Sequence, residues 1–501
     1  MSSQIRKVGI GLLIAFAALF LQLNYIQIWA AEDIASNPNN IRALIAEYSV
    51  KRGDIETYDG KLVATTRATP GRYKYERVYP EGELYAHIVG YKSLVYGETR
   101  LEASFDEELQ GKTAVQSMQD LEDTLSGGEE QGDDLRLTIH SKLQETARDL
   151  LAGRDGAIVA LNPQSGEVRA MWSNPSYDPN PLASHDTKEV RRYRQTLDPN
   201  SRTSPLISRA TSRSFAPGST FKVVTTAAAL ESGRYDAQST FPDPAALLPC
   251  EGPRSPGDPC IPQTDQDLTN FTRTACTGGG QIDLFTALEV SCDTTYAMLG
   301  MDVYEELRSV SEALGFNEPI PFDVGTEAST FPDVGDDNIP FRAFAGIGQG
   351  DVSATPLQMA LVAATIANDG VVPRPRLVRQ VIDPSGGIVE PFSPEMLGRA
   401  MSDETAARVN EMMQAVVVSG TGTSAQIPGV AVAGKTGTAQ TVPGESPHAW
   451  FIAFAPAEDP QLAVAVIVES SSAGSEATGG AVAAPLAKQI LEMDRAISTA
   501  W

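Results

Sequence analysis

The stretch Pro217-Gly218-Ser219-Thr220-Phe221-Lys222 opens an apolar run that continues to Leu230 and stops at Gly233. This pattern predicts a helix that starts at Ser219. Because Ser219 and Lys222 are three residues apart, both side chains should lie on one face of the first turn. A serine hydroxyl becomes a good nucleophile when a base takes its proton, and a partly buried lysine with a lowered pKa can be that base. The stretch indicates a serine–lysine pair, although this spacing is also common by chance.

A second polar stretch, Gly434-Lys435-Thr436-Gly437-Thr438-Ala439, follows apolar residues and precedes Trp450-Phe451-Ile452, which predicts an edge strand. Lys435 supplies a positive charge, Thr436 and Thr438 supply hydroxyls, and Gly437 allows close backbone approach. Such an edge suits an extended peptide with a terminal carboxylate. The plainer alternative is a glycine-rich hairpin.

A third stretch, Ser291-Cys292-Asp293, follows the apolar helical segment 284–290 and by itself is only a loop after a helix.

The composition sets limits on what the chain does. It has 501 residues, 42% of them hydrophobic and 21% charged, which predicts a globular protein of two or three domains. The net charge of −25 and the pI near 4.6 argue against a nucleic-acid partner, because binding to phosphates needs a basic face.

One segment predicts a membrane anchor. Residues 8–29 contain no charged side chain and would extend roughly 33 Å as a helix, enough for a hydrocarbon core of about 30 Å. Arg6 and Lys7 precede it and Glu32 and Asp33 follow, so the positive-inside rule leaves the N-terminus in the cytoplasm and the rest of the chain outside. A cleaved signal peptide is the alternative, but the residues before a cut near Ala31 are too large.

The four cysteines lie between positions 250 and 292 and, in an exported chain, indicate disulfides. Three connectivities are possible. The entropy of loop closure favours Cys250 with Cys260 and Cys276 with Cys292. A zinc site is the competing interpretation, but the chain has no Cys-x-x-Cys pair and its four histidines lie elsewhere.

Along the chain, residues 1–31 form the cytoplasmic tail and anchor, residues 32–150 a smaller mixed unit, and residues 151–501 one large α/β (α+β) domain. Strands are predicted at 157–161, 167–172, 450–455 and 462–468, and a closing helix at 485–496. We therefore expect an antiparallel sheet flanked by helices in the large domain.

Taken together, the three polar stretches resemble the Ser-x-x-Lys, Ser-x-Asn and Lys-Thr-Gly motifs of penicillin-binding proteins and serine β-lactamases. Residues 156–171, Ser176-Tyr177-Asp178-Pro179-Asn180 and 346–350 resemble further segments of the transpeptidase domain, and Arg52-Gly53-Asp54-Ile55 resembles the non-catalytic N-terminal (dimerisation or pedestal) domain of class B penicillin-binding proteins. The resemblance covers most of the chain from about residue 37 and is greatest to the single-pass actinobacterial PbpA type.

This resemblance implies a D,D-transpeptidase of peptidoglycan with a serine transpeptidase/β-lactamase-like fold and no cofactor or metal. Ser219 would be the nucleophile, Lys222 its base and Ser291 a proton relay. The backbone N–H groups of Ser219 and Thr438 would form the oxyanion hole. Lys435, Thr436, Gly437 and Thr438 would bind the substrate. Stem peptides ending in D-Ala-D-Ala would be the substrates, and β-lactam antibiotics would acylate Ser219.

Asp293 departs from the family, which usually has asparagine at this position. An ionised carboxylate only accepts hydrogen bonds, whereas an amide also donates. Asp293 beside Lys222 should stabilise the ammonium form and raise the pKa of the lysine. We expect the substitution to be tolerated, so that Asp293→Asn keeps or raises acylation by a labelled penicillin.

Several alternatives remain open from sequence alone. A serine β-lactamase is normally a shorter secreted chain. A catalytically weak scaffold protein is supported only by Asp293. A D,D-carboxypeptidase would use water as acceptor at the same site. The family also suggests, as a partner, a polytopic membrane glycosyltransferase and proteins of the division or elongation machinery, at the outer side of the cell membrane.

Overall fold

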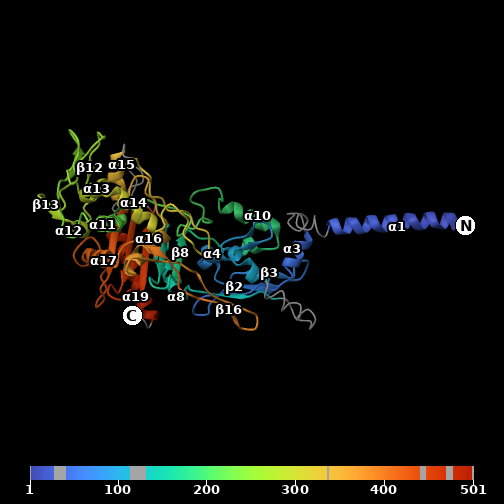
Figure 1. Cartoon of the computed structure of the whole chain (residues 1–501). Helices are drawn as coiled ribbons and strands as arrows, with labels where there is room; N and C mark the ends of the chain where they lie inside the picture. Colours follow the sequence, from blue (N-terminus) through green and yellow to red (C-terminus); the bar gives the residue numbers. More distant parts are fainter. Residues whose placement is uncertain are drawn as a thin grey trace.

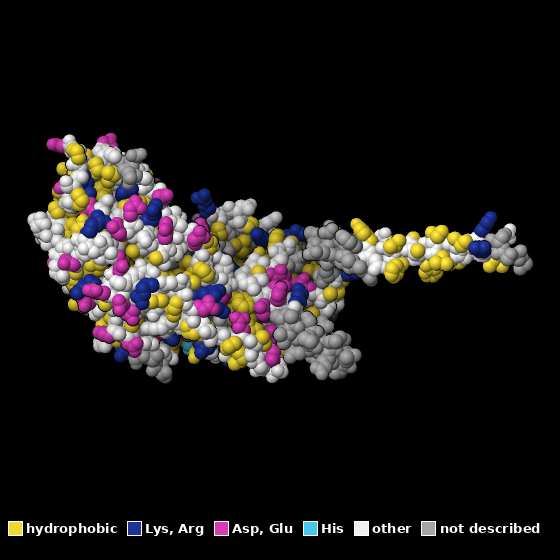
Figure 2. Space-filling view, viewed as in Figure 1, with side chains coloured by type: hydrophobic (Ala, Val, Ile, Leu, Met, Phe, Trp, Pro, Cys, Tyr) yellow, Lys and Arg dark blue, Asp and Glu magenta, His cyan; other side chains and the backbone are white. Residues whose placement is uncertain are grey.

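The computed structural model of the chain describes residues 2–26, 41–112, 131–335, 338–439, 447–469 and 478–498. Helix α1 (Ser2–Asn24) contains the apolar segment Gln4–Asn24, which is long and apolar enough to cross a membrane. None of this segment is buried in the folded chain, and Figure 2 shows hydrophobic side chains along its length. The end of the predicted anchor, residues 27–29, and its acidic flank, Glu32 and Asp33, lie outside the described residues.

The large domain is built around a five-stranded antiparallel sheet. Its strand order is β18 (Ala433–Ala439), β19 (His448–Ala455), β20 (Leu462–Val468), β7 (Gly156–Leu161) and β8 (Val168–Asn174). Every residue of β7, β19 and β20 is buried, so both faces of the sheet are covered. The predicted antiparallel sheet is confirmed. β18 is an edge strand, also as predicted, and pairs with β19 alone in this sheet.

Helices form the layers around this sheet (Figure 1). α8 (Ser141–Leu150) and α19 (Ala484–Ile497) pack against each other and against β8, β19 and β20. α16 (Pro356–Ala367), which is completely buried, packs on β7, β19 and β20, with α17 (Asp403–Val418) beside it and against β18. A helical group lies next to α17 and α16: α11 (Lys222–Glu231), α12 (Leu284–Glu289), α13 (Asp293–Asp302), α14 (Tyr304–Ala313) and α15 (Ile339–Gly346).

The N-terminal unit has a mixed six-stranded sheet. Its order is β16 (Ile388–Pro391), β15 (Val378–Ile382), β6 (Asp134–Leu137), β1 (Ile55–Glu56), β2 (Leu62–Ala68) and β3 (Tyr75–Val78). β1 and β6 pair in parallel, and the other pairs are antiparallel. The β15–β16 hairpin comes from the C-terminal half of the chain, so the two halves share one sheet. In Figure 1 this hairpin reaches across to the strands of the N-terminal unit.

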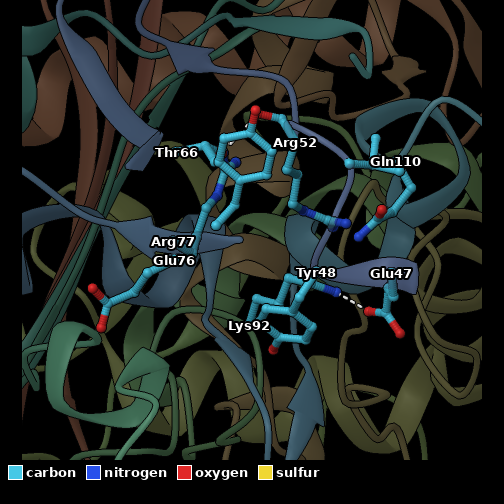
Figure 3. Close-up of a pocket in the computed structure, with 10 residues that line it drawn as sticks. Glu47, Tyr48, Arg52, Thr66, Glu76, Arg77, Lys92 and Gln110 are labelled. Carbon is cyan, nitrogen blue, oxygen red and sulfur yellow. Dashed lines mark hydrogen bonds and ion pairs between the residues drawn. The ribbon is translucent and has the colours of Figure 1, made fainter. Parts of the chain in front are cut away.

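A buried charge cluster holds the N-terminal unit together. The Glu102 carboxylate, which is fully buried, accepts from Arg52 and Arg77 at 2.6 Å each. Burial by itself would raise the pKa of Glu102, but the two arginines lower it to about 2. Figure 3 shows the small pocket beside this cluster, where Arg52 and Arg77 lie near Tyr48 and Lys92, and where Lys92 pairs with Glu47. The attraction and hydrogen bonds between these buried charges offset much of the cost of removing them from water.

Two disulfides join Cys250 to Cys260 and Cys276 to Cys292, the pairing that loop closure favours. The first lies in a small sheet of β10 (Ala246–Pro249), β11 (Cys260–Ile261) and β12 (Leu268–Thr269). The remaining elements are short, apart from α10: α3 (Ile41–Glu47), η2 (Gly82–Tyr85), α4 (Ala86–Val89), β4 (Lys92–Ser93), β5 (Gly97–Glu98), α5 (Leu101–Ser104), α6 (Asp106–Leu109), α9 (Asn180–Ala183), α10 (Thr187–Thr196), η3 (Gly218–Phe221), β9 (Thr240–Pro242), β13 (Gln281–Asp283), β14 (Val371–Pro373), β17 (Met396–Arg399), η4 (Thr423–Ala425) and η5 (Gly479–Ala483).

Candidate active site

Ser219 lies on a tight turn pressed against the edge strand. The sequence predicts an α-helix from Ser219, whereas the structure has a 3₁₀ turn over Gly218–Phe221 and α11 begins at Lys222. Gly218 has a φ of 53°, and a Cβ there would come within 3.0 Å of the Thr438 carbonyl oxygen. A glycine is needed for both reasons. The turn holds Ser219, which is partly exposed, beside β18.

Lys222 is fully buried, and its amine faces the Ser291–Asp293 segment. Nζ donates to the Ser291 carbonyl oxygen at 2.8 Å and to Asp293 Oδ1 at 2.7 Å, and it lies 3.3 Å from Ser291 Oγ. Within the part of the chain that the structure describes, Ser219 Oγ has no hydrogen-bond partner. Catalytic hydrogen bonds are often incomplete before substrate binds.

Two opposing effects act on the pKa of Lys222. Burial lowers it and the Asp293 carboxylate raises it, and the result lies below the ordinary value of a lysine. The predicted effect of Asp293 therefore has the expected sign, but desolvation outweighs it. A buried amine with a lowered pKa is suited to accept a proton from a serine.

Ser291 connects α12 to α13 in an unusual backbone conformation. Its φ is 63°, which is uncommon for a residue other than glycine. Its N–H donates to the Leu288 carbonyl oxygen, and Cys292, the next residue, is tied to Cys276. Strained positions of this kind persist where the surroundings impose them, and they are frequent at functional sites. In this conformation the Ser291 hydroxyl lies between Lys222 and Lys435.

Lys435 reaches the same hydroxyl from the other side. Its Nζ donates to Ser291 Oγ at 2.8 Å and to the Thr436 carbonyl oxygen at 3.1 Å, and its side chain is fully buried. Burial and the nearby Lys222 charge lower the pKa of Lys435 well below its ordinary value, while Asp293 raises it. One carboxylate thus faces two buried amines, so the site favours a state in which at least one amine is neutral.

Alternation along β18 separates its predicted binding residues into two groups. Lys435 and Gly437 face the turn and Ser291, and a Cβ at Gly437 would come within 2.8 Å of Thr220 Cγ2. Thr436 and Thr438 face the opposite side. The Thr436 hydroxyl lies 2.6 Å from that of Thr421, and Thr438 Oγ1 accepts from the Gly479 N–H at 3.5 Å.

One group of side chains has the spacing that a metal ion needs. It consists of Asp243, Cys276 and Cys292, whose ligand atoms lie within 4.8 Å of one another. The two sulfurs are bonded to each other, so the thiolates that zinc would need are absent from this group. The Asp243 carboxylate instead accepts from the main chain of Cys276, Thr277 and Gly279.

Sequence reasoning missed three contributors to the site. The main-chain N–H of Phe271 donates to Asp293 Oδ2 at 3.1 Å, the Tyr296 ring lies 5.4 Å from Lys222 Nζ, and Thr421 holds the Thr436 hydroxyl. Tyr296 follows Asp293 by three residues, so helical spacing after the motif was a signal that could have found it. No local pattern marks the other two.

Comparisons with known proteins agree with this geometry. The profile of the penicillin binding protein transpeptidase domain matches residues 156–492, and that of the penicillin binding protein A dimerisation domain matches residues 52–135. The chain is 39% identical to the peptidoglycan D,D-transpeptidase PbpA of Mycolicibacterium smegmatis, over 97% of this chain and 98% of that protein. It is 36% identical to PbpA of Mycobacterium tuberculosis, over 98% and 99%.

Solved structures give the same result. The ceftriaxone acyl-enzyme complex of penicillin-binding protein A from M. tuberculosis superimposes with a TM-score of 0.82 at 36% identity, covering 90% of this chain and 99% of that one. A D,D-transpeptidase domain from Eggerthella lenta gives 0.76 at 34% identity, covering 90% and 99%. The profile match across most of the chain, the near full-length relatives and the shared fold lead to one conclusion: this chain belongs to the penicillin-binding protein transpeptidases.

Proposed function

We propose that this chain is a peptidoglycan D,D-transpeptidase that forms an acyl-enzyme at Ser219, both with stem peptides ending in D-Ala-D-Ala and with β-lactams. The observation that carries the proposal is the meeting of Lys222, Ser291 and Lys435 next to the turn that holds Ser219, with Ser291 Oγ 2.8 Å from Lys435 Nζ and 3.3 Å from Lys222 Nζ. The names and titles of the relatives, which describe D,D-transpeptidases and β-lactam acyl-enzymes, support it.

In the acylation step, Ser219 Oγ attacks the carbonyl carbon of the penultimate D-Ala while neutral Lys222 takes its proton. The backbone N–H groups of Ser219 and Thr438 stabilise the oxyanion, a contribution of about 2.7–4 kcal/mol per donor in comparable enzymes. The amide bond to the last D-Ala then breaks. Ser291 passes a proton to the leaving amine from the lysine pair.

In the second step, an amine of a neighbouring stem peptide attacks the acyl-enzyme, and the proton path runs in reverse to return Ser219 to its hydroxyl form. Before the first step, Lys435, Thr436 and Thr438 bind the terminal carboxylate of the donor peptide, with Gly437 allowing the peptide to approach β18 as an added strand. The Thr436 and Thr438 hydroxyls have to leave their present partners to do so, because in the free enzyme they contact the Thr421 hydroxyl and the Gly479 N–H.

The site operates outside the cytoplasmic membrane in this proposal. Residues 1–31 are the cytoplasmic tail and anchor, residues 32–150 the N-terminal domain and residues 151–501 the transpeptidase domain. The apolar helix Gln4–Asn24 supports anchoring, and the two disulfides support an oxidising compartment. Glycan polymerisation falls to a polytopic membrane glycosyltransferase partner, together with proteins of the division or elongation machinery.

Mass spectrometry of the intact full-length chain after incubation with penicillin tests the nucleophile. We expect one adduct, mapped to the peptide that contains Ser219, and none in Ser219→Ala. An adduct on another residue, or the same labelling in Ser219→Ala, would overturn the assignment. Incubation with two stem peptides distinguishes the acceptor: a crosslinked dimer supports the transpeptidase, whereas release of D-Ala with only the trimmed monomer identifies a carboxypeptidase.

A further inference from the structure

Both carboxylate oxygens of Asp293 receive a donor. Oδ1 faces the Lys222 amine at 2.7 Å, and Oδ2 accepts the main-chain N–H of Phe271 at 3.1 Å. The Phe271 side chain is 65% exposed, so its main chain, and not its ring, is what reaches the catalytic centre. This second donor comes from the loop after β12, which lies outside the three motif stretches.

Asn270 fixes the position of that N–H. Its side chain is almost fully buried, and its amide uses all of its groups: Nδ2 donates to the carbonyl oxygens of Pro244 at 3.1 Å and Thr274 at 3.0 Å, and Oδ1 accepts from the Thr294 N–H at 3.0 Å. Thr294 directly follows Asp293. Asn270 therefore ties the loop to the helix that carries the carboxylate.

The bond to Thr294 also completes the start of α13. The N-cap residue of this helix, Cys292, makes no side-chain cap, although the first N–H groups of a helix need acceptors. Asn270 supplies one from a distant part of the chain, in the way that a local asparagine would. The contact is thus a built feature with a donor and an acceptor role, and not a chance approach of a surface loop.

The carboxylate of Asp293 interacts with two hydrogen-bond donors, the Lys222 amine and the Phe271 N–H. A hydrogen bond at Oδ2 stabilises the ionised carboxylate and draws negative charge away from Oδ1. We propose that Asn270 is a positioning residue for acyl transfer: it holds the Phe271 N–H on Asp293 and so weakens the hold of Asp293 on the Lys222 ammonium. The inference rests on the proposed acylation of Ser219 with Lys222 as base.

Other groups around Lys222 would not respond to this loop in the same way. The groups that face its amine within the described residues are Asp293 and the Tyr296 ring on α13, Ser291 before that helix, and Lys435 on β18. Of these groups, Asp293 is the one that receives the Phe271 N–H, and Asn270 bonds to Thr294, the residue that follows Asp293. A change at Asn270 should therefore act on Lys222 through Asp293.

The pH dependence of acylation by a labelled penicillin, measured on the full-length chain, tests this. With Asn270→Ala, Oδ2 loses its donor, Asp293 attracts the ammonium more strongly, and the pKa of Lys222 rises. The acidic limb of the acylation rate should move up by about one pH unit. Acylation should then be about tenfold slower below the limb and near the parent rate above it. A merely structural role would lower the rate equally at every pH.

Further variants make the result specific. Asp293→Asn removes the carboxylate that raises the pKa of Lys222, so its limb should lie at lower pH than in the parent chain, and adding Asn270→Ala should not shift it again. Thr272→Ala, an exposed change in the same loop whose hydroxyl contacts Thr274, should keep the parent profile. If Asn270→Ala does not fold, Phe271→Pro removes the same N–H directly and should give the same upward shift.

An unmoved limb in a folded Asn270→Ala or Phe271→Pro chain would overturn the inference, as would an equal shift in the Asp293→Asn background. Failure of the proposed function itself looks different, because labelling would then persist in Ser219→Ala or be missing from the parent chain.

Discussion

At the scale of single residues, Ser291 combines a chemical and a backbone constraint. Its hydroxyl touches both buried lysines, and its φ of 63° lies in the left-handed region. A serine costs more than a glycine in this conformation, so the hydroxyl and not the backbone accounts for a serine here.

Ser291→Ala and Ser291→Gly separate these two constraints. Both lose the hydroxyl, so acylation by penicillin should fall by about 10²–10⁴-fold in both, as when a positioned proton-transfer group is lost. Ser291→Gly should be more stable than Ser291→Ala by about 1 kcal/mol, because it relieves the backbone strain. Stopped-flow labelling and thermal unfolding measure the two effects, and a Ser291→Gly chain that acylates at the parent rate would contradict the proton relay.

Residue-level prediction from sequence was possible where a motif carries the chemistry, and the catalytic roles of these residues stay predictions. Ser219, Lys222, Ser291, Asp293 and Lys435 were all singled out, and the structure brings the last four into contact next to the serine turn. The sign of the pKa change at Lys222 is harder to predict from sequence. Burial lowers this pKa and Asp293 raises it, and the extent of burial is a property of the folded chain. The Phe271 contact was out of reach, since any residue type but proline can offer a main-chain N–H.

At the scale of elements, the site depends on how closely the serine turn approaches β18. A Cβ at Gly437 would lie 2.8 Å from Thr220 Cγ2, 2.9 Å from the Pro217 carbonyl oxygen and 3.0 Å from Trp450 Cβ. The Trp450 indole also donates to the Ala216 carbonyl oxygen at 3.0 Å, which anchors the turn from the neighbouring strand. The distance between the turn and the strand therefore has little freedom.

Gly437→Ala should push the turn away from β18. A displacement near 1 Å at a reacting centre can cost about 10²-fold in rate, so penicillin acylation should fall by roughly that factor. Gly252→Ala is the matched control, because a Cβ there meets no atom within 4 Å. Second-order acylation rates of the two variants decide the matter, and a Gly437→Ala rate equal to that of the control would show that the turn tolerates the shift.

Elements with a strong local sequence pattern could be predicted, whereas those imposed by packing could not. The apolar runs that became β7, β8, β19, β20 and α19 are long and strongly patterned, and the structure confirms them. The 3₁₀ form of the serine turn was missed, because it is imposed by the packing of Gly218 against Thr438 and not by local preference.

At the scale of the whole molecule, the buried Arg52–Glu102–Arg77 group and the catalytic centre lie in different parts of the chain. The carboxylate of Glu102 is fully buried between the two guanidinium groups, 2.6 Å from each. Removing the charge of one member leaves the others uncompensated, which is the costly way to break such a group.

Glu102→Gln should destabilise the N-terminal unit by about 3–5 kcal/mol. Glu306→Gln, which breaks the exposed pair with Arg234, should change stability by less than about 0.5 kcal/mol. Because the pKa of Glu102 is about 2 in the folded chain, below its ordinary value of 4.5, its contribution is fully present above pH 4.5 and is lost as pH falls towards 2. Thermal unfolding of the parent chain and both variants at pH 7 and at acid pH checks the size and the sign, and equal melting temperatures for the two variants at pH 7 would refute it.

The shared six-stranded sheet has a consequence for how the chain is made. Strands β1, β2, β3 and β6 leave the ribosome long before β15 and β16, which complete the sheet beside β6. Until then β6 presents an unpaired edge, and such edges invite pairing with other chains. During synthesis, the N-terminal part therefore has to avoid pairing with other chains until residues 378–391, which form the β15–β16 hairpin, have been translated.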